Sequence, residues 1–232
     1  MGTVRFDALT RWEAATYVRD ELVRGRGGRI LVVSHDQLRD LDTDDWRQTL
    51  ADADLVLTGS ATAAWASRLA GAPVPERISG PDLVDALCAA GNADGRRIYL
   101  VGGAAAAPGM PGAAVRAAAV LGLRHPRLRV SGCVTPTAAV DRDENALDAV
   151  VADIVEAKPD LVLIGVDSSG AERALVSAVR SQLAGSWIFS YTGLVRDLVG
   201  DPGQRDGHAA HLPYSARLLT RAAKGRVFGR RA

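Results

Sequence analysis

The sequence has few cysteines and no long hydrophobic run, and each scarcity excludes a class of protein. Only two cysteines occur among 232 residues, Cys88 in an apolar stretch and Cys133 beside a predicted strand end. Their separation does not match the spacing of zinc ligands, so we interpret both as small core residues in a reducing compartment. No apolar run approaches the roughly 20 residues that span a bilayer. The stretch MGTVRFDALTRWEAA lacks the layout of a signal peptide. We therefore expect a cytoplasmic protein without stable membrane association.

The sequence also has almost no net charge. Lys and Arg total 28 against 27 Asp and Glu, a formal net charge of +1. This balance gives no general reason to expect a nucleic-acid partner. The exception is the C-terminal segment 201–232, which we interpret as a basic helix with a solvated charged face. Its basic residues, with no acid between them, are Arg217, Arg221, Lys224, Arg226, Arg230 and Arg231.

Six short apolar runs recur along the chain, and most are continuously hydrophobic. This pattern is typical of parallel strands that are covered on both faces. Amphipathic stretches alternate with the runs; the clearest, residues 143–158, has one apolar stripe and is closed by Pro159. The alternation predicts an α/β fold with a doubly wound, Rossmann-like, mostly parallel sheet. The predicted strands are residues 29–34, 53–58, 97–102, 128–132, 160–166 and 186–191.

The carboxyl ends of these strands predict where a ligand binds, because sheets of this kind bind ligands there. Small and polar residues follow most of the strands. They are Ser34, His35 and Asp36, residues 58–62, Gly102 and Gly103, Gly132, residues 167–172 and residues 191–196.

The stretch YLVGGAAAAPG ends a predicted strand in Gly102 and Gly103, just before a predicted helix. Small residues in such a turn can offer backbone N–H groups and a helix N-terminus to phosphate. The stretch is not G-x-G-x-x-G and has no P-loop lysine, so it indicates neither a dinucleotide site nor a Walker site. By itself, it fits a diphosphate site and a simple tight turn equally well.

Two further stretches carry candidate ligand-binding residues. In VPERISGPDL, Arg77 lies on a loop that prolines stiffen, and a rigid guanidinium suits a phosphate or a carboxylate. The alternative is a structural ion pair with Glu76 or Asp82. In LIGVDSSGAER, the side chains of Asp167 and Ser168 can hydrogen-bond a sugar, a ribose or a base, or they can cap the following helix.

Taken in order, VPERISGPDL, RIYLVGG and KPDLVLIGV resemble the pattern of the WecG/TagA/CpsF bacterial glycosyltransferases, from about residue 29 to the C-terminus. The resemblance implies a two-lobed Rossmann-like domain. It implies transfer of a sugar from a nucleotide diphosphate to a lipid-linked acceptor, without a metal ion or other cofactor. We expect an acceptor-side lobe at about 1–95, a nucleotide-side lobe at about 96–200 and the basic helix at 201–232.

Several residues match the family pattern. Arg77 matches the arginine of the family, and Gly102 and Gly103 match its phosphate turn. Glu172 matches the glutamate that ends the family's P-K-Q-E motif, although the three residues before it differ.

Other positions depart from the family pattern. Ser34 and Asp36 stand for the threonine and asparagine of a T-x-N turn. The family's catalytic aspartate falls on Gly59, so the usual general base is missing. A second family aspartate falls on Arg196, which suggests a substrate that carries an anionic group.

The missing base leaves three interpretations. Asp36 or His35 has taken over its role, or the protein binds a nucleotide sugar without catalysing transfer. The third is an acceptor that needs little deprotonation, such as a thiol or thione, because free thiols ionise near about pH 8.5 and are strong nucleophiles.

We predict a metal-independent glycosyltransferase that moves a sugar from a UDP- or GDP-linked donor to a small soluble acceptor. The acceptor we favour is a thiol or thione such as ergothioneine, as in S-glycosylation during antibiotic biosynthesis. The alternatives are a catalytically degenerate nucleotide-sugar-binding or partner protein, and an enzyme of cell-surface polymer synthesis with a lipid-linked acceptor. The sequence leaves a homo-oligomer open. The predicted catalytic residues are Arg77, Asp36 and His35, those that bind the nucleotide sugar are Gly102, Gly103, Asp167, Ser168 and Glu172, and those that bind the acceptor are Ser34, Ser60 and Arg196.

Overall fold

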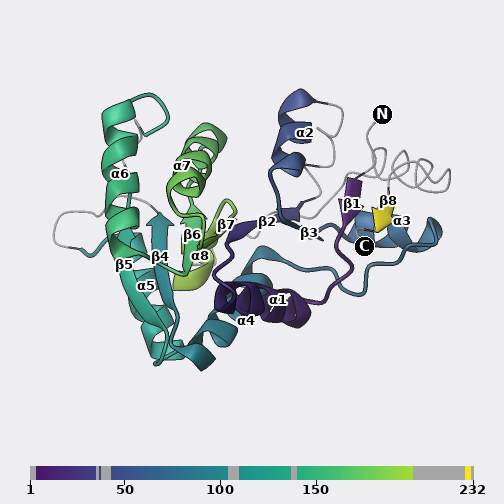
Figure 1. The fold of residues 1–232 in the computed structure, drawn as a ribbon, viewed down its shortest axis with the longest axis horizontal. Helices are drawn as coiled ribbons and strands as arrows, with labels where there is room; N and C mark the ends of the chain where they lie inside the picture. The colour runs from purple at the N-terminus through teal and green to yellow at the C-terminus, as the bar shows by residue number, and fades with distance from the viewer. Residues whose placement is uncertain are drawn as a thin grey trace. The chain divides into compact units, whose positions relative to one another are not determined.

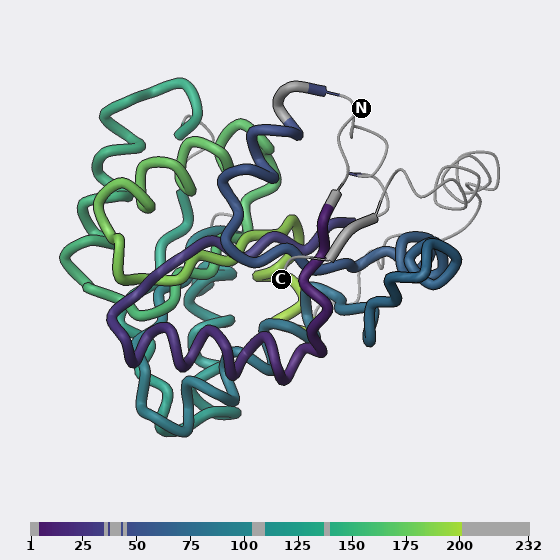
Figure 2. Tube along the Cα trace, turned by 45° about the vertical axis from the view of Figure 1, so that its right-hand side comes forward, coloured from purple at the N-terminus to yellow at the C-terminus, as the bar shows by residue number. Residues whose placement is uncertain are grey.

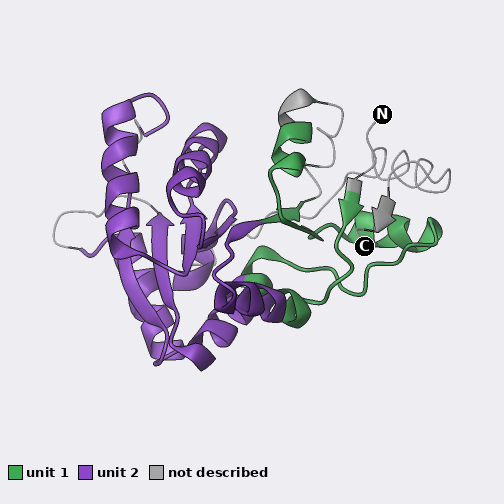
Figure 3. Cartoon of the chain, in the orientation of Figure 1, with its two compact units in different colours: residues 1–14, 30–83, 204–232 green, residues 15–29, 84–203 purple. Residues whose placement is uncertain are grey.

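The chain is divided into two units in the structure, a computed structural model that describes residues 4–34, 37, 43–103, 110–136, 140–200 and 228–230. Unit 1 comprises residues 1–14, 30–83 and 204–232, and unit 2 comprises residues 15–29 and 84–203 (Figure 3). The chain thus leaves unit 1 within its first helix and returns to it in the strand that follows. Figure 2 traces this first helix and the following strand in purple, at the N-terminal end of the colour bar. The predicted assignment of lobes to acceptor and nucleotide stays a prediction.

Unit 2 is built on a parallel sheet whose strands have the order β7-β6-β4-β5 (Figure 1). Strands β6 and β7 are buried along their whole length, as their continuous hydrophobicity predicts. The strands are β4 (Arg97–Gly102), β5 (Arg129–Val134), β6 (Leu161–Gly165) and β7 (Trp187–Ser190). The helices are α1 (Arg11–Val23) and α4 (Gly80–Asp94), each shared with unit 1, and α5 (Ala113–Arg124), α6 (Glu144–Ala157), α7 (Ser169–Gln182) and α8 (Leu194–Val199).

Helices cover both faces of this sheet. Along each strand, successive side chains point to opposite faces. Tyr99 and Val101 of β4 share one core cluster with residues of α6 and α7. Leu100 lies between them in sequence and faces the other side, whereas the buried residues of α5 do not belong to that cluster. The prediction of a doubly wound parallel sheet is confirmed.

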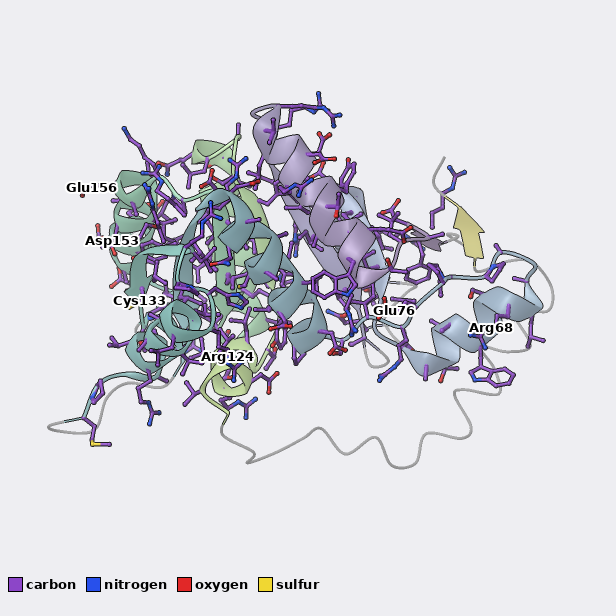
Figure 4. The ribbon with its side chains drawn as sticks, turned by 90° about the horizontal axis from the view of Figure 1, so that it is seen from below. Arg68, Glu76, Arg124, Cys133, Asp153 and Glu156 are labelled. Atoms are coloured by element: carbon purple, nitrogen blue, oxygen red, sulfur yellow. The ribbon has the colours of Figure 1, made fainter. Side chains whose placement is uncertain are left out.

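Gly132 of β5 serves packing in unit 2. A Cβ at this position would lie 2.4 Å from Cε2 of Tyr99, so the glycine lets the Tyr99 ring lie across β5. The Tyr99 hydroxyl donates a hydrogen bond to Asp153 of α6. Burial and the neighbouring Asp153 raise the pKa of Tyr99. Figure 4 shows Asp153 and Cys133 on the same side of this unit.

Both cysteines are free. Cys88 is fully buried in α4, and burial raises the pKa of its thiol to about 12. Cys133 is half-buried on β5, and burial raises its pKa as well. A raised pKa disfavours the reactive thiolate form at both positions, which agrees with their predicted role as small core residues.

The described part of unit 1 contains two pairs of parallel strands. β2 (Gly28–Val33) pairs with β3 (Leu55–Thr58) from Ile30 onward, and β1 (Val4–Phe6) pairs with β8 (Phe228–Arg230). Two helices, α2 (Asp44–Ala51) and α3 (Ala61–Leu69), contribute Trp46, Ala63 and Ala66 to the core that Val33 and Val56 line.

All six predicted strands are present, as β2 to β7. The predicted basic helix at 201–232 is wrong for Phe228–Arg230, which forms strand β8 because its backbone pairs with β1. The other residues of that segment lie outside the described part of the chain. None of the helices in the described ranges is both long and apolar enough to cross a bilayer.

Gly122 offers a test of the helix assignment of α5. Nothing lies within 4 Å of the position that a Cβ would take there. Because Gly costs about 0.8–1.0 kcal/mol relative to Ala inside a helix, Gly122→Ala is expected to raise the free energy of unfolding by about 0.5–1 kcal/mol. Gly91 of α4 is the matched control, because a Cβ there would lie 3.0 Å from Cδ1 of Leu128. Urea denaturation measures both variants, and an equal gain at the two positions would contradict this packing.

Candidate functional site

The carboxyl edge of the sheet in unit 2 has a point where the order of the strands reverses. From β4 the chain passes through α5 to β5 on one side, whereas β6 and then β7 lie on the other side. At such a topological switch point, the connecting helices lie on opposite faces and leave a crevice between neighbouring strand ends. The switch point of unit 2 therefore lies between the ends of β4 and β6.

Glycines at this switch point bring the two strand ends into close contact. Gly102 has a φ of +132°, and a Cβ there would lie 2.2 Å from the carbonyl oxygen of Gly165. A Cβ on Gly165 would lie 2.8 Å from the Cβ of Leu194. Gly103 has a φ of +83°, and its N–H donates to the Gly165 carbonyl over 3.3 Å. Only glycine fits this turn, because a side chain on Gly102 would meet the backbone of Gly165 and because both Gly102 and Gly103 have a positive φ.

The same turn lies against the beginning of α5. A Cβ on Gly103 would lie 2.8 Å from the Cβ of Ala113 and 3.4 Å from the backbone nitrogen of Ala114. The N-cap residue of α5 is Gly112, which has no side chain to cap the helix. The first N–H groups of a helix that no described side chain caps can bind an anion, which the positive end of the helix dipole attracts.

Thr135 connects these parts of the turn. Its hydroxyl donates a hydrogen bond of 3.1 Å to the carbonyl oxygen of Gly102. The hydroxyl oxygen also lies 3.7 Å from the position that a Cβ would take on Gly112. The Thr135 hydroxyl therefore lies beside both the glycine turn and the start of α5. Sequence reasoning missed Thr135, because it lies beyond the end of β5 and belongs to none of the motifs.

The start of α7 lies after the neighbouring strand β6. Ser168 is the N-cap, and its Oγ accepts from the N–H of Ala171 over 3.3 Å and donates to Asp141 over 3.1 Å. Of the two roles that the sequence left open, capping is thus confirmed for Ser168. The Asp167 side chain is exposed and makes no hydrogen bond or ion pair within the described part of the chain.

Glu172 ties α7 to the end of β7. Its half-buried carboxylate accepts a hydrogen bond of 2.7 Å from the Ser190 hydroxyl. Tyr191 follows at once, and its hydroxyl donates to Asp197 over 3.1 Å. Arg196 is exposed, and its guanidinium lies over Gly193, with Nη2 3.1 Å from where a Cβ would be.

Arg77 of unit 1 has no partner among the described residues, whereas the acids beside it do. Glu76 accepts from the backbone N–H of Arg11 over 2.9 Å and lies 3.6 Å from its guanidinium. Asp82 lies 3.7 Å from the same guanidinium. The predicted alternative, a pair between Arg77 and one of these acids, is therefore wrong. Within the described residues, the exposed Arg77 side chain makes no hydrogen bond or ion pair.

Position 59 has little room for the missing aspartate. A Cβ on Gly59 would lie 3.0 Å from Cγ1 of Val32 and 3.2 Å from the carbonyl oxygen of Ile78. The backbone on each side is fixed, because the N–H of Ile78 donates to Thr58 over 2.9 Å. Any larger residue at this turn needs its neighbours to move by a few tenths of an ångström.

The two serines predicted to contact the acceptor have local partners. Ser60 is only 2% exposed and caps α3 by accepting from the N–H of Ala63 over 3.2 Å. A direct contact with an acceptor would need this buried hydroxyl to become exposed. Ser34 is exposed and exchanges hydrogen bonds with Gln37, at 2.9 Å and 3.3 Å. His35 and Asp36, the predicted substitutes for the base, lie outside the described residues.

No group of three or more His, Cys, Asp and Glu side chains in the described ranges is arranged to hold a metal ion. A model of the glycosyl transferase WecG/TagA/CpsF family matches residues 1–201. The matched range includes the glycine turn, Glu172 and Arg77. No curated protein sequence matches the chain.

Proposed function

Since the chain belongs to the WecG/TagA/CpsF family of glycosyltransferases, we propose that it binds a nucleotide diphosphate sugar at the switch point of unit 2. The observation that carries this proposal is the turn at Gly102 and Gly103, which contacts both β6 and the uncapped start of α5. A diphosphate there gains N–H donors and the positive end of a helix dipole. The same dipole stabilises the charge that develops on the leaving group.

The residues around the turn suit the rest of the donor. Asp167 has an exposed carboxylate without a partner among the described residues, and Glu172 uses one oxygen for Ser190 and keeps the other. Carboxylates accept hydrogen bonds from ribose and sugar hydroxyls. Ser168 adds a hydroxyl oxygen at the same strand end. We assign these three residues to the nucleoside or the sugar.

Arg77 supplies positive charge to the reaction. Its guanidinium is uncompensated within the described residues, because Arg11 already occupies the neighbouring acids. An unpaired guanidinium can bind an anionic group, such as the carboxylate of an acidic acceptor, through two parallel hydrogen bonds. The exposed Arg196 side chain also makes no ion pair within the described part of unit 2. Its positive charge therefore suits an anionic group on the donor or on the acceptor.

The acceptor we propose is small, soluble and already nucleophilic, such as a thiol or thione. The turn at residues 58–62 has no carboxylate, and the packing around Gly59 restricts the space where the family places one. Ser34 would line the acceptor side, with His35 and Asp36 next to it in sequence. The alternative is a lipid-linked acceptor, as is typical of the family.

The reaction then needs little acid–base chemistry from the chain. The acceptor sulfur attacks the anomeric carbon of the sugar and forms a carbon–sulfur bond. The bond from that carbon to the diphosphate oxygen breaks, and the nucleoside diphosphate leaves with the electron pair. A thiolate brings no proton, and a thiol releases its proton to water or buffer.

Calorimetry with GDP and UDP in EDTA tests the donor site. We expect one of them to bind, and we expect added Mg²⁺ to leave its affinity within a few-fold, because the proposed ligands of the diphosphate are N–H groups. Guanosine and uridine, which lack the diphosphate, are the controls and should bind more weakly. Absence of binding by every nucleotide and nucleotide sugar, or binding that requires the metal ion, would overturn the proposal.

A further inference from the structure

The peptide group between Gly102 and Gly103 is held by one hydrogen bond on each side. Its N–H, which belongs to Gly103, donates to the Gly165 carbonyl at the end of β6 over 3.3 Å. Its carbonyl, which belongs to Gly102, accepts from the Thr135 hydroxyl over 3.1 Å, and Thr135 directly follows β5. Because β6 and β5 flank β4 in the sheet, the two bonds fix this peptide from opposite sides.

Glycine on both sides makes the same peptide easy to turn. Gly102 and Gly103 have φ values of +132° and +83°, and neither has a Cβ that would limit rotation of the peptide plane between them. A backbone carbonyl or N–H that loses its partner favours orientations in which it finds another. The orientation of this peptide therefore depends on its two hydrogen bonds, of which Thr135 supplies the one to the carbonyl.

The Gly102 carbonyl also lies near the start of α5. The Thr135 hydroxyl oxygen that holds it is 3.7 Å from the position that a Cβ would take on Gly112, the N-cap residue of that helix. A carbonyl oxygen carries a partial negative charge, so it repels a diphosphate and can itself accept from the first N–H groups of a helix. A released Gly102 carbonyl would thus compete with an anion for the same donors.

We propose that Thr135 is a positioning residue of the donor site, which holds the Gly102 carbonyl and so leaves the N–H groups at the start of α5 to the diphosphate. The inference rests on the proposed function, because it needs a diphosphate beside the glycine turn. Without the hydroxyl, the peptide populates further orientations in which its carbonyl competes with the ligand. The observed affinity then falls in proportion to the fraction of molecules that keep the binding orientation.

Thr135→Val tests this role, because valine has nearly the shape of threonine but no hydroxyl. Ser131 of β5 offers a matched control, since its hydroxyl donates to the Ile98 carbonyl of β4 over the same distance of 3.1 Å. Ile98 lies near the beginning of β4, whereas Gly102 ends it. Ser131→Ala therefore removes the same kind of hydrogen bond to the same strand, away from the turn. Thr135→Ser, the conservative variant, keeps a hydroxyl at position 135.

Calorimetry on the full chain measures the binding of GDP, UDP and inorganic pyrophosphate to these forms. We expect Thr135→Val to weaken binding of pyrophosphate and of the bound nucleotide by the same factor, about 3- to 10-fold, which is the usual net effect of one hydrogen bond. Thr135→Ser and Ser131→Ala should stay within about 1.5-fold of the wild type. Urea denaturation should show similar losses of stability in Thr135→Val and Ser131→Ala, so that stability alone does not explain the difference in binding.

Each other outcome decides against the inference in a distinct way. If the wild type binds GDP or UDP and Thr135→Val binds it equally well, the role of Thr135 is overturned and the proposed function stands. An equal loss of affinity in Ser131→Ala would show a general effect of loosening β5, and an equal loss in Thr135→Ser would show that the hydroxyl is not responsible; either result overturns the inference. If the wild type binds no nucleotide, the proposed function fails together with the role of Thr135.

Discussion

Arg77→Ala is expected to lower kcat/KM for sugar transfer about 10²–10³-fold, which is the usual cost of removing one hydrogen-bond donor that stabilises charge in a transition state. The guanidinium is exposed and makes no ion pair within the described residues, so its loss should leave the melting temperature unchanged. Transfer is measured as release of the nucleoside diphosphate, with thermal unfolding recorded on the same preparations.

Two variants control for charge and for structure. Arg77→Lys keeps the charge but not the planar fork, and should recover only part of the activity. Arg11→Ala removes the partner of Glu76 and Asp82 and should act on stability rather than on transfer. If Arg77→Ala transfers sugar at the wild-type rate, or if Arg77→Ala is as destabilising as Arg11→Ala, Arg77 does not have the role proposed for it.

Gly112→Asp is expected to weaken nucleoside diphosphate binding about 10- to 100-fold, because it adds a negative charge within about 5 Å of the diphosphate in a site of intermediate dielectric. The position accepts a side chain, since a Cβ there would have Oγ1 of Thr135 as its nearest neighbour, at 3.7 Å. Aspartate is also a good N-cap residue, so the free energy of unfolding should not fall.

Gly112→Asn is the matched control for this substitution. Asparagine caps a helix about as well as aspartate and has nearly the same shape, but it carries no charge. Calorimetry should show that the asparagine variant keeps most of the affinity for GDP or UDP, and the ratio between the two variants isolates the electrostatic effect. Equal binding by Gly112→Asp and the wild type would place the diphosphate elsewhere.

The strands of unit 2 could be predicted because their burial on both faces requires continuous apolar runs, such as residues 160–166. Strands β1 and β8 could not, because a three-residue strand has no periodicity to recognise. The position of the glycine turn at a strand end also followed from the sequence. The close contact between this turn and Gly165 could not be predicted, because Gly165 lies on β6, which neighbours β4 in the sheet but does not follow it directly along the chain.

The partners of the candidate residues were harder to predict than their positions. Arg11 pairs with Glu76 across 65 residues of sequence, so the local alternative for Arg77 looked reasonable and was wrong. Ser60 was predicted from its place after a strand, yet its burial depends on how α3 packs. Tyr191 was placed at the ligand-binding edge only as part of residues 191–196, and its hydrogen bond to Asp197 could not be predicted from the sequence.

The pairing of β1 with β8 has a consequence for the order of folding. Val4 pairs with Phe228, so this contact joins the two ends of the sequence. A contact between such distant residues forms late, because a long loop must close first and because residues 228–230 are synthesised after all of unit 2. Unit 2, whose last segment ends at residue 203, can fold during synthesis before unit 1 acquires its final strand. Until residues 228–230 have been synthesised, β1 lacks its pairing partner β8, and a nascent chain stalled before residue 228 would expose that edge to chaperones.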